Sequence, residues 1–226
     1  VHHYGTMKAK EGSDKGEIYY ELGKKKIDES GGNARAVYEL AVQAARLRRY
    51  DEAVELWKRF LGSGSNEDLH LAHLNLGHVY LETGRHAEAA AACKKALEID
   101  PGLKEARLNL AMSEFYMGRP KEAAVILDDL IRKIPDYIPA RALLAATLIL
   151  TGENNRYKAI VDHMRKEDIN SAVFFQTYAD KLLSAGREED GAILLKAARE
   201  SWRGLLISRG LEASDEEIER VMVIAA

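Results

Sequence analysis

Three histidines have the spacing closest to that of a metal or catalytic site in this chain. His70 and His73 lie three positions apart, and His78 follows five positions later. On a helix, the first two would share one face, where two imidazoles can bind one metal ion. A metal site needs further ligands, and no cysteine or carboxylate stands at a matching spacing. We therefore expect no metal site, and we expect these histidines on a helix surface or in a groove.

The candidates for covalent chemistry are equally few. Cys93 is the single cysteine, which excludes an internal disulfide. It occupies a position that holds Trp57 and Leu127 in neighbouring copies of the repeat described below, so it is predicted to be a small buried hydrophobic residue. No serine lies in a Gly-x-Ser-x-Gly elbow, and no glycine loop is suited to phosphate. The sequence thus predicts no catalytic residue, no cofactor and no enzymatic activity in the isolated chain.

The strongest signal is a repeated pattern. Asn75-Leu76-Gly77 recurs 34 positions later as Asn109-Leu110-Ala111, and Gly84-Arg85 recurs as Gly118-Arg119. An upstream copy is displaced by 36 positions because the linker of residues 62–66 is two residues long for the pattern. Weaker copies follow downstream, with glycines at positions 152 and 186.

The residue types at these positions indicate paired helices. Small residues (Gly77 with Ala89, and Ala111 with Ala123) allow two antiparallel helices to approach closely. The turn glycines can adopt the left-handed conformation that ends a helix. Nothing in the chain alternates with the period of two that is typical of strands.

This pattern resembles the tetratricopeptide repeat, a helix-turn-helix unit of the same period. The resemblance implies an all-α fold, a right-handed superhelix (α-solenoid) of antiparallel helix pairs with terminal capping helices. We expect about five repeats over residues 34–211, and their predicted ranges are 34–69, 70–103, 104–137, 138–170 and 171–208.

The two ends lie outside this pattern. Residues 1–13 are predicted to be a leader or linker, and residues 14–33 a helix that docks on the first repeat through Ile18, Tyr19, Leu22 and Ile27. Residues 212–226 carry a capping box at Ser214 and Glu217, followed by an amphipathic helix. Solenoids need their terminal apolar faces covered, so both helices are predicted to be caps, although the last helix could instead fill the groove or join two copies.

In the tetratricopeptide family, the first helix of each repeat lines a concave groove that binds a protein or peptide segment. Transferring the family's positions to this sequence gives a largely apolar groove with a polar rim: Tyr38, Leu74, Asn75, His78, Leu108, Asn109, Met112, Phe115 and Tyr116. The basic residues that clamp a terminal carboxylate in some members are missing, since Tyr38, Glu105 and Asn109 stand at those positions. Asn75 and Asn109 match the asparagine that can hold an extended backbone.

The first residues resemble a second family. Val1-His2-His3-Tyr4-Gly5, before a lysine-rich helix and the repeats, is similar to the junction in some family 2 glycosyltransferases. That resemblance implies a non-catalytic, substrate-recruiting or oligomerising region of a larger enzyme, whose catalytic domain would lie upstream of Val1. The Asp-x-Asp motif of a complete enzyme is absent.

Composition narrows the class of partner. The net charge of −3, with 31% charged residues, gives no electrostatic case for nucleic acid. No apolar run reaches the length of about 20 residues that a membrane span needs. We expect a cytoplasmic scaffold that binds a protein segment, with self-association as a further option.

Overall fold

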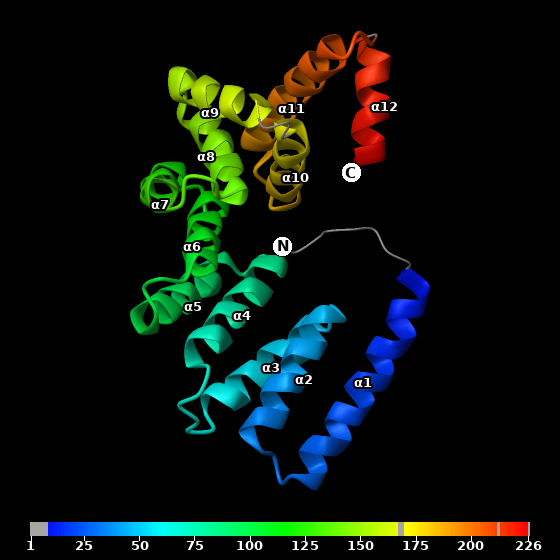
Figure 1. The fold of residues 1–226 in the computed structure, drawn as a ribbon, viewed down its shortest axis with the longest axis vertical. Helices are drawn as coiled ribbons and strands as arrows, with labels where there is room; N and C mark the ends of the chain where they lie inside the picture. Colours follow the sequence, from blue (N-terminus) through cyan, green and yellow to red (C-terminus); the bar gives the residue numbers. More distant parts are fainter. Residues whose placement is uncertain (1–8, 167–169, 212, 226) are drawn as a thin grey trace. The chain divides into compact units, whose positions relative to one another are not determined.

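The computed structural model describes residues 9–166, 170–211 and 213–225, which form twelve helices and no strand (Figure 1). The all-α prediction is therefore confirmed for this part of the chain. The helices are α1 (Ala9–Glu29), α2 (Ala34–Arg46), α3 (Tyr50–Leu61), α4 (Leu69–Glu82), α5 (His86–Ile99), α6 (Lys104–Tyr116), α7 (Pro120–Lys133), α8 (Ile138–Thr151), α9 (Asn154–Lys166), α10 (Ser171–Ser184), α11 (Glu188–Ser208) and α12 (Asp215–Ala225). Each predicted repeat range contains two consecutive helices. The chain divides into two compact units, Val1–Asn109 and Leu110–Ala226, and the division falls within α6.

Short turns join the helices of each pair, and their glycines explain the sharp reversal. Gly84, Gly118, Gly152 and Gly186 all have φ between 73° and 78°, as the sequence predicts. The first pair differs, because Arg48 occupies the equivalent position with φ 58°. A side chain is rarely found in this left-handed region, so the first turn is held by its surroundings rather than by its own residue.

Within the N-terminal unit, α4 packs against α3 on one side and α5 on the other. The α4–α5 pair is closest at Gly77, where an added Cβ would lie 2.8 Å from the Cys93 sulfur and 3.4 Å from the Ala89 carbonyl oxygen. Cys93 is fully buried at this crossing, and burial raises the pKa of its thiol to about 12. The predicted packing role of these small residues is confirmed.

Helix α1 docks on α2, but through a different face from the predicted one. Ile18, Tyr19 and Leu22 are exposed, whereas Tyr20 and Ile27 are buried. The true docking face combines these two residues with Gly16 and Gly23, whose missing side chains leave room for Leu47 and Leu40. The sequence prediction followed the largest apolar side chains and did not consider that glycine spacing could define the contact face.

Polar contacts hold α1 in this orientation. The Tyr20 hydroxyl donates to Glu52, and the Arg49 guanidinium lies 4.4 Å from the centre of the Tyr20 ring and 2.7 Å from the Glu17 carboxylate. Burial and the neighbouring Glu52 raise the pKa of Tyr20 to about 12. The helix begins at Ala9, so residues 9–13 are helical and not the predicted linker.

In the C-terminal unit, α8 contacts α7, α9, α10 and α11, and it is the most deeply buried helix of this unit, with every residue from Ala140 to Leu148 buried. Helix α12 packs on α10 and α11. Its Ile218 and Met222 are buried, and the Gln176 amide of α10 donates to the Met222 carbonyl oxygen at 2.8 Å. These contacts are those of a helix that covers the end of the unit.

None of the helices described combines the length and the apolar character that crossing a membrane requires.

A pair of glycine substitutions tests the close approach. Gly77→Ala should lower the free energy of unfolding by about 1–3 kcal/mol, because the new methyl group overlaps the Cys93 sulfur. Gly204→Ala is the control: it lies inside α11 with no atom within 4 Å of the added Cβ, and it should stabilise by about 0.5–1 kcal/mol. Urea denaturation measures both, and equal effects would contradict the assigned contact.

A second pair tests the docking of α12. Ile218 is 1% exposed and Ile224 is 84% exposed on the same helix. Ile218→Ala should cost about 2–5 kcal/mol, the usual range for a buried isoleucine, and Ile224→Ala should have little effect. A thermal melt in which both variants behave like the parent chain would show that α12 is not docked in solution.

Candidate peptide-binding site

Tyr38 is the centre of the candidate site in the N-terminal unit. Helix α2 presents its ring to α3, where it meets Trp57 and Phe60 edge to face at centroid distances of 5.0 and 5.2 Å. Trp57 and Phe60 are buried, while Tyr38 remains half-buried. This aromatic cluster fixes the ring, so that the hydroxyl group and one edge are presented to the solvent side.

The charged groups beside Tyr38 come from two other parts of the unit. The Arg35 guanidinium lies 5.5 Å from the Tyr38 ring centre, 3.2 Å from Glu39 and 3.4 Å from Asp68. Asp68 precedes α4 with φ 53°, and its side chain makes no capping bond to that helix. Its carboxylate faces Arg35 instead, so a strained backbone position holds an acidic group at the pocket.

Asn75 joins this cluster from α4. Its side-chain amide donates a hydrogen bond to the Tyr38 oxygen, so the structure brings together two predicted groove residues that are 37 positions apart in the sequence. Burial and then the Asp68 charge raise the pKa of Tyr38, while Arg35 and Asn75 act in the opposite direction. A peptide backbone would compete with Tyr38 for the Asn75 amide.

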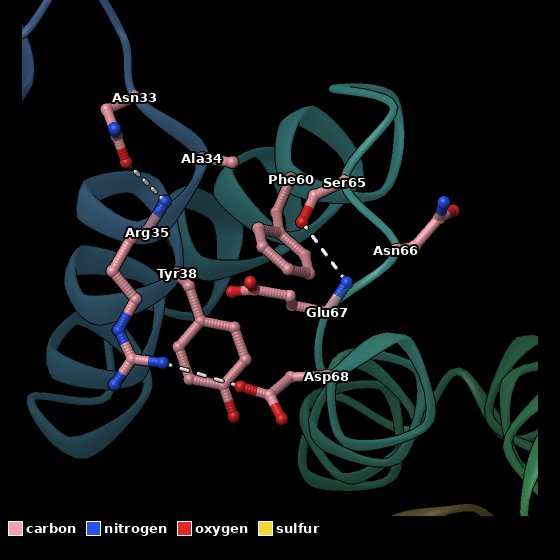
Figure 2. A pocket seen from close by; sticks show the side chains of 9 residues that line it. All are labelled: Asn33, Ala34, Arg35, Tyr38, Phe60, Ser65, Asn66, Glu67 and Asp68. Atoms are coloured by element: carbon pink, nitrogen blue, oxygen red, sulfur yellow. Dashed lines mark hydrogen bonds and ion pairs between the residues drawn. The ribbon is translucent and has the colours of Figure 1, made fainter.

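A pocket of about 440 Å³ opens above this cluster (Figure 2). The start of α2, the Phe60 ring and the loop before α4 line it, as shown by the residues Asn33, Ala34, Arg35, Tyr38, Phe60, Ser65, Asn66, Glu67 and Asp68. Figure 2 shows Glu67 reaching across the pocket near the two rings, whereas Asn66 points away. The loop spans residues 62–68, compared with residues 100–103 between α5 and α6. The insertion detected in the sequence therefore builds one wall of the pocket.

The chemistry of the pocket favours a cationic side chain. The loop contributes the two carboxylates of Glu67 and Asp68, and Arg35 is shared between Asp68 and Glu39. Aromatic rings form the floor, and their faces attract cations. A basic group entering the pocket would meet carboxylates on one side and a ring on the other.

The other predicted groove residues of this unit lie on α4 and α6. Leu74 is half-buried and His78 is exposed on α4, while Leu108 and Asn109 are half-buried on α6. Sequence reasoning missed Asp68 and Glu67, because both stand in a loop whose extra length carried no residue-type signal of its own.

In the C-terminal unit, two predicted groove residues are covered. Phe115 is 0% exposed and Tyr116 is buried, while Met112 stays half-buried. The Tyr178 ring of α10 meets Phe115 at 5.9 Å, and the Arg187 guanidinium donates to the Phe115 carbonyl oxygen at 2.6 Å. Phe115 and Tyr116 therefore do not line an open surface, because the fifth helix pair packs over the end of α6. The Gly186-Arg187 turn carried the only sequence signal for this contact.

The histidines do not form a metal site. Within the described residues, no group of three or more His, Cys, Asp and Glu side chains is arranged to hold a metal ion. His73 is half-buried and His78 is exposed. His2 and His3, which carry the resemblance to glycosyltransferases, lie outside the described residues.

Comparisons with known proteins agree with the helix pairs. Two family models, both described as tetratricopeptide repeat, match residues 38–104 and 80–147. The chain is a tetratricopeptide repeat protein. No curated protein matches it. The matched ranges include α2 to α7 and most of α8, and so contain the whole candidate site.

Solved tetratricopeptide repeat structures share the fold at low sequence identity. A protein from Parabacteroides merdae has a TM-score of 0.63 and 18% identity, and the match covers 95% of this chain and 79% of that one. YrrB, described as a tetratricopeptide repeat protein with an unusual peptide-binding site, has a TM-score of 0.59 and 18% identity, with coverages of 80% and 93%. MamA from Desulfovibrio magneticus has a TM-score of 0.58 and 15% identity, with coverages of 76% and 96%.

The hydrogen bond between α2 and α4 can be measured by a double-mutant cycle. Tyr38→Phe and Asn75→Ala should each destabilise the chain slightly, and the double variant should lose less than their sum by about 0.5–1.5 kcal/mol, the usual contribution of one hydrogen bond. Equilibrium unfolding of the four proteins gives the coupling. Strict additivity would mean that the two side chains do not interact.

Proposed function

We propose that this chain is a non-catalytic scaffold that binds an extended segment of a partner protein along the face of the N-terminal unit carrying Tyr38, Leu74, Asn75 and His78. A basic side chain of that segment is anchored in the pocket above Tyr38. The observation that carries the proposal is the position of Asn75, whose amide lies between the half-buried Leu74 and the pocket that contains Tyr38.

The arrangement suits an extended ligand. An extended chain leaves its backbone groups unpaired, and a side-chain amide can donate to and accept from them. Leu74 provides an apolar contact next to this amide, and the pocket with its carboxylates lies on the other side. The YrrB description of a peptide-binding site on a similar fold supports the same class of ligand.

The proposal is tested with the full chain and a phage-displayed library of random peptides. Selected peptides should carry a Lys or Arg residue, and their affinity should fall about tenfold with Glu67→Gln and with Leu74→Ser, as expected for residues contributing more than about 1 kcal/mol. Asn75→Ala should weaken binding further, because the ligand backbone loses its partner. Glu122→Gln, an exposed carboxylate on α7, is the matched control and should leave binding unchanged.

Two results would contradict this function. One is a set of selected peptides without basic residues whose binding is indifferent to Glu67→Gln. The other is peptides that bind equally well to the parent chain and to the Leu74→Ser and Asn75→Ala variants. Thermal melts of every variant exclude unfolding as the reason for a lost signal.

A further inference from the structure

A second cavity of the N-terminal unit lies apart from the candidate site. It has a volume of about 560 Å³ and is lined by α3, α4 and α5. A stripe along α4, formed by Leu69, His73, Leu76 and Tyr80, makes its floor. None of these residues lines the pocket above Tyr38. We call this cavity the α3–α5 trough.

The sequence of α5 explains why the trough is open. This helix reads His-Ala-Glu-Ala-Ala-Ala-Ala-Cys at its start, and Ala91 and Ala92 form its side of the trough. Alanines fill little of the space between α5 and α3, where larger residues would close it. Leu61 provides the apolar wall on the α3 side.

The outer helices of the C-terminal unit are arranged differently. There the Arg156 guanidinium of α9 bonds to the Asp128 carboxylate of α7 at 2.6 and 2.8 Å, which bridges two helices that correspond to α5 and α3 in the repeat order. In the N-terminal unit the equivalent positions hold Glu88 and Lys58. Glu88 pairs with Arg85, and Lys58 pairs with Glu55 at 3.0 Å, so each charge is satisfied beside its own helix.

One end of the trough carries two unsatisfied nitrogen groups. The Nδ1 atom of His73 is buried and has no hydrogen-bond partner in the described part of the chain. Lys95 lines the same cavity and makes no ion pair with the residues described, and its positive charge acts on His73. Burial and then Lys95 lower the pKa of His73, with Glu98 opposing, so the imidazole is neutral near pH 7 and can donate from Nδ1. Two donors at this end favour a carboxylate.

We infer that the α3–α5 trough is a second binding surface, which takes a short extended peptide segment with aliphatic side chains and one acidic side chain. The aliphatic groups lie over Leu76 and Ala92, and the carboxylate accepts hydrogen bonds from Lys95 and His73. This inference does not rest on the proposed function, whose pocket is on other helices and favours the opposite charge.

The length of the trough sets the size of the segment. From Leu69 to Tyr80 the floor rises about 16 Å along the α4 axis, at about 1.5 Å per residue. An extended chain of about five residues covers that distance. Since alternate side chains of an extended chain face the same way, the fitting pattern is an acidic residue followed by leucines at every second position.

The probe is therefore a fluorescein-labelled, C-terminally amidated peptide, Gly-Ser-Asp-Ser-Leu-Ser-Leu-Gly-Ser, titrated with the full chain and followed by fluorescence anisotropy. Amidation removes the terminal carboxylate, so only the aspartate can supply the acidic group. Two comparison peptides carry Lys in place of Asp, or Ser in place of both leucines, and both should bind at least about tenfold more weakly.

Two variants and their matched controls locate the site. Ala91→Trp fills the trough from an exposed position of α5, and Lys95→Glu reverses the charge at its end; each should weaken binding about tenfold or more. Ala87→Trp and Lys94→Glu are exposed positions on the same helix that do not line the trough, and they should bind like the parent chain. The lysine peptide should recover binding to Lys95→Glu.

The inference is overturned if the aspartate peptide does not bind saturably, if Ala91→Trp binds as well as the parent chain, or if the two control variants lose affinity equally. Glu67→Gln, in the pocket above Tyr38, should leave this binding unchanged. Loss of binding in Glu67→Gln would assign the peptide to the other pocket and remove the support for the trough.

Discussion

The close approach of two antiparallel helices within each pair is the constraint on which this structure depends. Ala41, Ala111, Ala145 and Ala179 occupy equivalent positions on the first helices of their pairs and are all fully buried, and Gly77 takes that position in the second pair. Small side chains here let the backbones come close enough for the surrounding leucines and aromatic rings to fill the remaining space. The larger side chains can then vary from repeat to repeat, and the two cavities of the N-terminal unit reflect this variation.

The pocket and the trough arise from opposite departures from the repeat. The pocket above Tyr38 exists because the chain is longer than usual between α3 and α4, which places Glu67 and Asp68 above an aromatic cluster. The trough exists because α5 carries less side-chain volume than its neighbours, so that the floor formed by α4 stays uncovered. Each site is therefore built from the regular scaffold by one local change, and the charges around the two sites favour ligands of opposite sign.

The C-terminal unit shows how the same scaffold closes. Tyr178 and Arg187 of the fifth pair cover Phe115, and α12 covers α10 and α11 through Ile218 and Met222. Arg187 bonds a main-chain carbonyl at the end of α6, a group that would otherwise need water as its partner. Side chains that a position in the repeat assigns to a groove are thus used here for packing between pairs.

The sequence by itself determined the helix pairs, their turns and their small-residue contacts, because these depend on local backbone preference and on spacing along one chain. Gly77, Gly84 and Ala89 could be assigned without coordinates for this reason. It also indicated Tyr38 and Asn75 as neighbours of a ligand, although not that they bond to each other. Only the tertiary structure decided which face of α1 docks, that Phe115 is covered, and that Asp68 turns away from its own helix towards Arg35. These outcomes depend on side chains that come together from distant parts of a unit, and no periodicity along the chain records which of them meet.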